Sequence, residues 1–216
     1  MTLTLYQHPF SSYCQKAITA LYEKGLPFEA KLLDRSEPVA SEFAALSPMG
    51  KMPILVHEGR TVFEATAIIE YLEARFPETT RLIPADPLAA AEVRMWERFF
   101  DNYIAYPQWR IFAPRLGMEA DDGGEKWRAM ADKAYGVLEA RMADREWVAA
   151  DMFSMADCAA APHLLYIDWC YPITDEYPNL RAYRTRLTQR PSYARALDEA
   201  RPYRVGVPMD IPEGRD

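Results

Sequence analysis

The stretch LTLYQHPFSSYCQK, residues 3–16, decides the fold of this chain. It opens with a run typical of a β-strand, residues 3–6, which ends before Pro9 because proline cannot donate to a sheet ladder. Over residues 12–23 the apolar side chains recur at helical spacing, and Gly25 follows as a stop signal. We therefore predict a strand that passes into a helix through a turn containing two serines.

The segments that follow alternate between strands and helices. The alternating residues 28–33 predict a strand, and residues 39–46 predict either a short helix or an irregular turn. Residues 53–56 and 61–63 predict two strands joined by a turn at Glu58-Gly59. Residues 65–76 carry apolar side chains at helical spacing. The resulting order, β-α-β-α-β-β-α, predicts a small layered α/β unit.

The second part of the chain is predicted to be helical. The segments with helical periodicity are 88–112, 125–144, 155–170, 179–188 and 192–200. We therefore expect an α/β domain over residues 1–77, a proline-rich linker over 78–87 and an all-helical domain over 88–201. Residues 202–216 form a tail that we expect to lie over the surface.

Composition excludes several classes of protein. The 216 residues include 25 Lys and Arg against 32 Asp and Glu, a formal net charge of -7. A chain this acidic, without a basic run, argues against nucleic acid or an anionic membrane as the main partner. The apolar runs are shorter than the roughly 18 residues that a membrane span needs. The start, MTLTLYQHPF, has neither a basic nor an apolar region, so we do not expect a signal peptide.

The cysteines and histidines point to no disulfide framework and no metal site. The cysteines are odd in number and widely spaced, at positions 14, 158 and 170. This pattern favours reduced thiols and a cytoplasmic location. The three histidines lack the spacing of metal ligands, so we expect no metal.

The turn at Ser11-Ser12 is the first candidate site. The first N–H groups of a helix have no intrahelical partner, and the helix dipole places partial positive charge there. Such an end stabilises an anion and favours a thiolate, to which a hydroxyl can add a hydrogen bond. The alternative is that Ser11 or Ser12 only caps the helix, and for this segment taken alone capping is favoured.

Other motifs also allow two interpretations. A cis Met52-Pro53 bond would let the Met52 backbone pair with an extended peptide ligand, whereas base rates favour an ordinary trans proline. Glu64 at a helix start suits the dipole and could also bind a ligand ammonium; taken alone, the structural role is favoured. Ser154 and Asp157 have the spacing of a capping box, which we interpret as structural.

Taken together and in this order, these segments resemble the cytosolic glutathione transferase superfamily. The elements that carry the resemblance are Ser-x-x-Cys after the first strand, Gly-Lys-Met-Pro at 50–53, Glu-Ala at 64–65, the proline linker and Ser-Met-Ala-Asp at 154–157. They are similar to serine-type classes such as theta, zeta and delta and cover residues 3 to about 202. The resemblance implies a thioredoxin-like N-terminal domain, an all-α C-terminal domain, a homodimer and reduced glutathione as cosubstrate.

The resemblance also implies roles for single residues. Ser11 stands where serine-type members keep the hydroxyl that activates the glutathione thiol, with Ser12 and then Tyr6 as rivals. Ser11-x-x-Cys14 looks like the thioredoxin Cys-x-x-Cys with its first sulfur replaced by oxygen, so thiolate activation is expected in place of disulfide exchange. The implied glutathione-binding residues are Lys51, Met52, Pro53, Glu64, Ala65 and Thr66.

Three of these positions have specific implied contacts. Met52 precedes the family's cis-proline, and its backbone pairs with the cysteinyl part of glutathione. Glu64 matches the acid that holds the γ-glutamyl amino group. Residue 65 departs from the family, which usually has a serine there to donate to the γ-glutamyl carboxylate. With Ala65 in its place, the neighbouring Thr66 or a backbone N–H would donate to that carboxylate instead.

An electrophile pocket is expected between the domains, facing the Ser11 turn. Aromatic walls suit a flat apolar substrate. The candidate residues are Tyr103, Tyr106, Trp109, Arg110 and Phe112, with Tyr166 and Trp169 opposite. Pro107 lies among them, where the helix must bend or break.

The predicted function is that of a serine-type glutathione transferase with a role in detoxification. The thiolate of glutathione attacks an electrophilic, apolar or aromatic substrate by addition or displacement. One alternative is a non-catalytic binding protein on the same scaffold, motivated by Ala65, and another is a glutathione-dependent isomerase or dehalogenase. A disulfide oxidoreductase is disfavoured because position 11 is not cysteine and Cys14 is expected to be buried.

Overall fold

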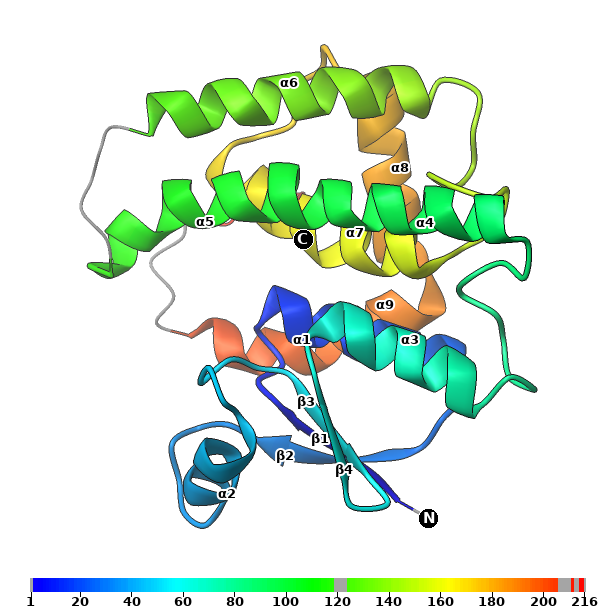
Figure 1. Cartoon of the computed structure of the whole chain (residues 1–216). Coiled ribbons are helices and arrows are strands. Elements are labelled where there is room, and N and C mark those ends of the chain that lie inside the picture. The colour runs from blue at the N-terminus through cyan, green and yellow to red at the C-terminus, as the bar shows by residue number, and fades with distance from the viewer. Residues whose placement is uncertain (1, 119–123, 206–210, 212–213, 216) are drawn as a thin grey trace. The chain divides into compact units, whose positions relative to one another are not determined.

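The computed structural model describes residues 2–118, 124–205, 211 and 214–215. The chain divides into two compact units (Figure 1). Unit 1 contains Met1–Ile83 and Pro191–Arg204, and unit 2 contains Pro84–Arg190 and Val205–Asp216.

Unit 1 is built on a four-stranded sheet. Its strands are β1 (Leu3–Gln7), β2 (Phe28–Leu32), β3 (Ile54–His57) and β4 (Arg60–Phe63), in the order β2-β1-β3-β4. β1 and β2 are parallel, joined by α1 (Ser12–Glu23) as the crossover helix, whereas β3 and β4 add in antiparallel fashion. A parallel pair needs such a crossover because a tight turn cannot join its strands.

Helices complete unit 1 around the sheet. α1 and α3 (Ala65–Arg75) pack against each other, and their side chains Ile18 and Ile68 are buried in the same core as Leu5. α2 (Val39–Leu46) contacts the sheet through a hydrogen bond from Tyr6 to Glu42. The predicted order β-α-β-α-β-β-α and the thioredoxin-like fold class are therefore confirmed.

The last α-helix among the described residues belongs to unit 1. α9 (Pro191–Ala200) packs on α1, where the Tyr193 hydroxyl donates to Gln15 Oε1 at 3.1 Å and Ser192 bonds Glu23. This differs from the sequence-based grouping of residues 88–201, because periodicity reveals a helix but not its tertiary partner. Residues 206–210, 212–213 and 216 of the predicted tail lie outside the described residues.

Unit 2 consists of helices. Its longer elements are α4 (Pro87–Phe100), α5 (Tyr106–Phe112), α6 (Glu125–Arg141), α7 (Met155–Cys170) and α8 (Pro178–Gln189). The prediction of one helix over residues 88–112 is wrong, since a π-helical segment, Asp101–Ala105, separates α4 from α5. Pro107 has no N–H to continue the ladder, and the Tyr106 N–H instead bonds Asp101, five residues earlier.

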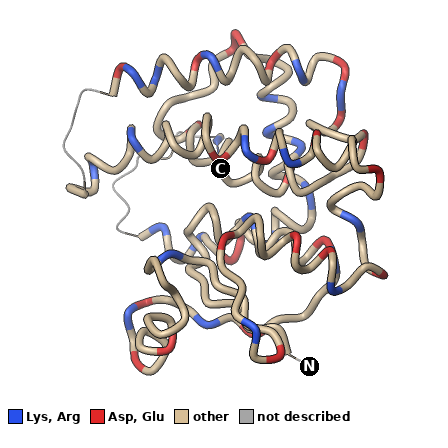
Figure 2. The backbone as a smooth tube through the Cα atoms, viewed as in Figure 1, with Lys and Arg blue, Asp and Glu red and all other residues tan. Residues whose placement is uncertain are grey.

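α7 is the centre of unit 2, and all sixteen of its residues are buried. Its apolar side chains surround the helix on every side, as expected for a fully buried helix. The predicted capping box is confirmed: the Asp157 carboxylate accepts from both the N–H and the hydroxyl of Ser154 at 2.9 Å. Basic and acidic residues are interspersed along both units (Figure 2). None of the described helices has the length and apolar character needed to cross a bilayer.

Candidate functional site

Strand register brings three of the predicted segments to one edge of the sheet in unit 1. Tyr6 of β1 pairs with Ile54 of β3, and Ile54 pairs with Phe63 of β4. The Ser11 turn follows β1, Met52-Pro53 precedes β3 and Glu64 follows β4. The segments that carry these residues therefore adjoin neighbouring strands at the same end of the sheet. We call this end the thiol edge (residues 8–12, 51–53 and 64–66).

Ser11 is the N-cap of α1. Its extended backbone (φ -82°, ψ 124°) ends the turn, and its Oγ accepts a hydrogen bond from the Cys14 N–H at 3.4 Å. The side chain is partly exposed. A hydroxyl has two acceptor lone pairs and one donor, so capping the helix leaves the proton of Ser11 available to a thiolate. The two alternative roles of this serine are thus compatible.

The two rivals of Ser11 differ in their surroundings. Ser12 begins α1 and is also partly exposed. The Tyr6 side chain is buried, and its hydroxyl donates to Glu42 Oε2 at 2.9 Å. Burial, together with Glu42, raises the pKa of Tyr6 to about 12. The hydroxyl proton of Tyr6 is therefore engaged in the hydrogen bond to Glu42 of α2.

The loop before β3 is held by local hydrogen bonds. The Met52-Pro53 peptide bond is cis, as the resemblance implies. The Ser47 hydroxyl accepts from the Lys51 N–H at 2.9 Å and donates to the Lys51 carbonyl at 3.1 Å. The Lys51 side chain is exposed.

The start of α3 carries the predicted γ-glutamyl contacts. Glu64 is exposed and has a positive φ of 69°, unusual for a residue other than glycine. Its carbonyl accepts the Ile68 N–H at 2.9 Å and so starts the helix, while its side chain makes no capping bond. Ala65 is buried and Thr66 is half-buried.

One residue of this region, Lys16, was not predicted from the sequence to lie near the site. Lys16 of α1 is fully buried, and its Nζ donates to Thr66 Oγ1 at 3.1 Å, which ties α1 to the start of α3. A lysine on an amphipathic helix is ordinarily exposed, and its partner here is 50 residues away in the chain. Local periodicity cannot detect such a pair.

Cys14 is fully buried, as expected, and burial raises the pKa of its thiol to about 11. At neutral pH it is therefore a thiol and not a nucleophilic thiolate. We expect Cys14→Ala to change the rate of glutathione conjugation by no more than about twofold, measured per folded molecule. Reduction of a mixed disulfide that disappears in this variant would contradict the interpretation.

The predicted electrophile-pocket residues lie around the junction of α4 and α5. Tyr103, Tyr106 and Trp109 are exposed, at 47%, 49% and 38%. The Arg110 guanidinium lies 5.0 Å from the centre of the Trp127 ring of α6, and Tyr106 meets the same ring edge-on. Phe112 is buried.

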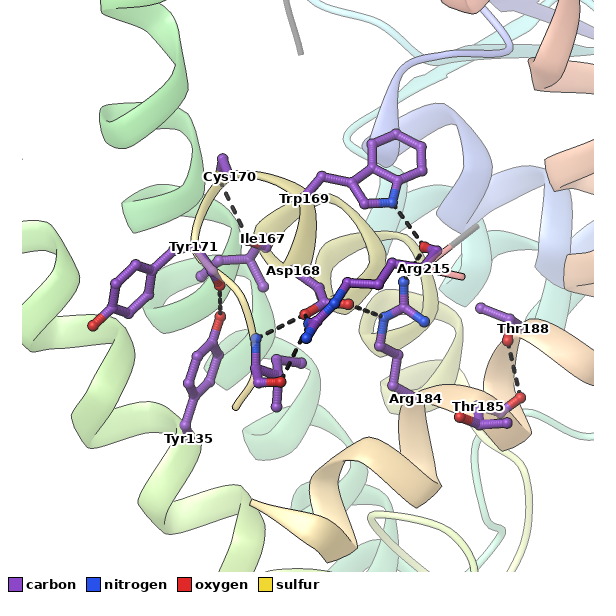
Figure 3. A network of polar contacts seen from close by, with 11 residues as sticks. Tyr135, Ile167, Asp168, Trp169, Cys170, Tyr171, Arg184, Thr185, Thr188 and Arg215 are labelled. Atoms are coloured by element: carbon purple, nitrogen blue, oxygen red, sulfur yellow. Dashed lines mark hydrogen bonds and ion pairs between the residues drawn. The ribbon is translucent and has the colours of Figure 1, made fainter. Parts of the chain in front are cut away.

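The two aromatic residues expected on the opposite wall are not exposed. Tyr166 and Trp169 are buried, and their rings pack together. The Trp169 indole N–H donates to the carbonyl of Arg215 at 2.9 Å, and the Arg215 side chain reaches Asp168, which also pairs with Arg184 (Figure 3). Arg215 of the tail is thus hydrogen-bonded to Trp169 and Asp168 of α7.

Comparison with known proteins identifies the family. The models described as "Glutathione S-transferase, N-terminal domain" and "Glutathione S-transferase, C-terminal domain" match residues 5–80 and 88–186. Protein LigF from Sphingobium sp. is 42% identical over 109 residues, 49% of this chain and 42% of LigF, so that match spans less than half of LigF.

Solved structures extend the likeness to nearly the whole chain. The structure of β-etherase LigF has a TM-score of 0.75 at 27% identity and covers 92% of this chain and 100% of LigF. A glutathione S-transferase from Methylobacillus flagellatus, solved with glutathione bound, has a TM-score of 0.78 at 27% identity and covers 90% and 98% of the two chains.

A thioredoxin-like unit followed by a helical unit is the architecture that these two family models describe. The chain belongs to the cytosolic glutathione transferase superfamily. It is a transferase with glutathione as cosubstrate. Within the described residues, no group of His, Cys, Asp or Glu is arranged to hold a metal ion.

Proposed function

We propose that this chain activates glutathione as a serine-type transferase, with the Ser11 hydroxyl donating to the thiolate. The observation that carries the proposal is the position of Ser11 as the N-cap of α1 on the thiol edge. The helix dipole and the hydroxyl both favour the anionic sulfur. The thiolate then attacks an electrophilic carbon, while the protein holds the two reactants together.

The other contacts of glutathione are proposed on the same edge. The backbone of Met52, before cis-Pro53, pairs with the cysteinyl part of the ligand, and Lys51 supplies a neighbouring polar contact. Glu64 holds the γ-glutamyl ammonium, for which an exposed carboxylate is suited. Ser12 and Tyr6 rank below Ser11 as activating groups. Ser11, and not Ser12, is the N-cap of α1, and the Tyr6 hydroxyl donates to Glu42.

The test combines calorimetry with kinetics. The full chain is titrated with glutathione, and conjugation of a generic aryl halide is followed with excess glutathione. Saturable binding with turnover supports the proposal. An absence of binding at millimolar glutathione would favour the non-catalytic alternative. A product screen that finds turnover without net consumption of glutathione would favour the isomerase or dehalogenase alternative.

Residue 65 allows a gain of function to be predicted. Ala65 lies at the start of α3, where a serine hydroxyl would donate to the γ-glutamyl carboxylate. We expect Ala65→Ser to tighten glutathione binding by about tenfold, because hydrogen bonds to charged groups are worth roughly 1.5 to 3 kcal/mol. Calorimetric titration with glutathione measures this change in affinity.

Ala67→Ser, an exposed position two residues along, is the matched control for the added hydroxyl. It is expected to leave glutathione affinity unchanged. Equal affinity of the Ala65→Ser variant and the unmodified chain would show that the carboxylate lies elsewhere.

The similarity to β-etherase LigF favours a second candidate function, cleavage of an ether. The thiolate would form a C–S bond at the ether carbon, and the C–O bond would break with its electron pair leaving on oxygen, which then takes a proton. The exposed Tyr103, Tyr106 and Trp109 would supply an aromatic wall for an aryl ether. Release of a fluorescent phenol from a model β-aryl ether tests this; aryl halide turnover without phenol release would reject it.

The remaining family properties are also proposals for this chain. We propose that it forms a homodimer in the cytoplasm and takes an apolar or aromatic electrophile, with Arg110 beside that substrate. The support is membership of the family and the three buried free cysteines. Sedimentation of the purified chain would test the dimer.

A further inference from the structure

Unit 1 contains a cavity that the glutathione site does not use. Its volume is about 590 Å³, within the usual range for small-molecule sites. None of its lining residues belongs to the thiol edge. They come from the end of β1, the second half of α1, the loop into β2, β2 itself and α9: Gln7, Ile18, Leu21, Tyr22, Gly25, Leu26, Pro27, Phe28, Ala30, Arg195 and Glu199.

Strand register explains how these residues meet. In the parallel β1–β2 pair, Leu3 is opposite Phe28 and Leu5 is opposite Ala30. Side chains alternate along a strand, so Phe28 and Ala30 lie on the same face as Gln7. α1 covers that face, and its Ile18 and Leu21 supply an aliphatic wall that is at least 97% buried. Because β2 is an edge strand, the cavity is at the edge of the sheet.

The deep polar group of the cavity is the Gln7 side chain. Gln7 is 5% exposed, and its Oε1 is buried with no hydrogen-bond partner among the described residues. Buried polar atoms are nearly always hydrogen-bonded. An acceptor in this position, beside the apolar side chains of Ile18 and Leu21, points to a ligand that brings a donor.

The rim carries a cation with free donors. The Arg195 guanidinium lies 4.0 Å from the centre of the Tyr22 ring, and its Nε pairs with Glu199 at 3.1 Å. Its two terminal nitrogens have no partner among the described residues, and the side chain is 64% exposed. Glu199 also accepts from the Tyr22 hydroxyl at 2.6 Å, so its negative charge is compensated within the rim.

We propose that this cavity binds a small hydroxyaryl carboxylate. The hydroxyl donates to Gln7 Oε1, the aryl ring lies against the aliphatic and aromatic lining, and the carboxylate pairs with Arg195. The Tyr22 ring, over which Arg195 lies, is 5.8 Å from the Phe28 ring, so the cation lies near the level of Phe28. At roughly 3.3 Å per residue, about 13 Å separates that level from the level of Gln7. A hydroxylated ring with a short acid chain and a hydrogen bond at each end matches this length.

The test uses calorimetry on the full chain. The probes have saturated side chains, so they offer no activated double bond that glutathione could attack. The main probe is 3-(4-hydroxyphenyl)propionate. The comparison probes are 3-phenylpropionate, which lacks the hydroxyl, and 4-ethylphenol, which lacks the carboxylate. We expect the main probe to bind about 3- to 10-fold more tightly than the first and about tenfold more tightly than the second. Saturating glutathione is expected to leave these affinities unchanged.

Two variants assign the contacts. Gln7→Leu replaces the buried acceptor by an apolar group of similar size, so the fold is retained while the preference for the hydroxyl is lost. Arg195→Ala removes the preference for the carboxylate. Arg60→Ala, which removes an equal charge from β4 at the opposite edge of the sheet, is the control and is expected to change neither.

The outcomes are distinct from those for the glutathione site. Absence of binding at millimolar probe would overturn the proposal, even if conjugation proceeds normally. Preferences that survive both Gln7→Leu and Arg195→Ala, or that disappear with saturating glutathione, would place the probe elsewhere and would also overturn it.

Discussion

Asp157→Ala is expected to lower the free energy of unfolding by about 3 to 5 kcal/mol, a large part of the roughly 5 to 15 kcal/mol that holds a typical domain together. The Asp157 side chain is fully buried at the start of α7. It accepts from the Ser154 N–H and hydroxyl at 2.9 Å, the Val148 N–H at 3.2 Å and the Tyr183 hydroxyl at 2.5 Å.

Charge and burial act together on Asp157. Burial raises the pKa of this carboxyl to about 6, against the opposing effect of its four hydrogen bonds, so it is ionised at neutral pH. Burial also raises the pKa of Tyr183 well above its usual value, which keeps that hydroxyl a donor. Truncation to alanine leaves the Val148 and Tyr183 donors without an acceptor at about 1 to 3 kcal/mol each, besides the lost cap.

Urea unfolding followed by circular dichroism measures the effect. Asp144→Ala removes an exposed carboxylate from the same unit and is expected to change stability by no more than about 0.5 kcal/mol. Asp157→Asn, which keeps one acceptor oxygen, should be intermediate. Equal, small losses in all three variants would show that the buried carboxylate does not hold the start of α7.

The sequence predicted those elements whose boundaries depend on local signals. The helices over residues 12–23 and 155–170 have the predicted bounds, because Ser11 and Ser154 cap them and the apolar pattern is continuous. The ordered motifs were sufficient to identify the family because their separations, rather than any one motif, are specific.

Features that depend on contacts distant in the chain could not be predicted. The apolar pattern of residues 88–112 is continuous and gives no sign of the π-helical segment, although Pro107 suggested a bend. Nothing in residues 192–200 indicates that they pack on α1. The Trp169 indole N–H has its hydrogen-bond partner in Arg215, which is 46 residues away.

Ser11→Ala is expected to lower kcat for glutathione conjugation by about 10- to 100-fold. The loss corresponds to one hydrogen bond to a charged group, roughly 1.5 to 3 kcal/mol. The pH at which half of the bound thiol is ionised is expected to rise by about 1 to 2 pH units for the same reason. Thiolate absorbance in the ultraviolet, measured across pH with glutathione bound, gives that midpoint.

The same substitution also removes the N-cap of α1, which by itself costs about 1 kcal/mol of stability. Two further variants separate capping from chemistry. Ser11→Asp keeps a capping oxygen but has no proton to donate and adds a negative charge, so stability should be retained and activity lost. Ser11→Thr keeps the hydroxyl and should retain both.

The rivals provide the remaining controls. Tyr6→Phe should leave the thiol midpoint unchanged, because the Tyr6 hydroxyl donates to Glu42 at 2.9 Å and its proton is held there. Ser12→Ala removes a hydroxyl one residue further along and leaves the cap intact. If Ser11→Ala conjugates the aryl halide at the unmodified rate while Ser12→Ala or Tyr6→Phe does not, the activating group is not Ser11. If Ser11→Asp keeps full activity, the helix N-terminus alone is sufficient to ionise the thiol.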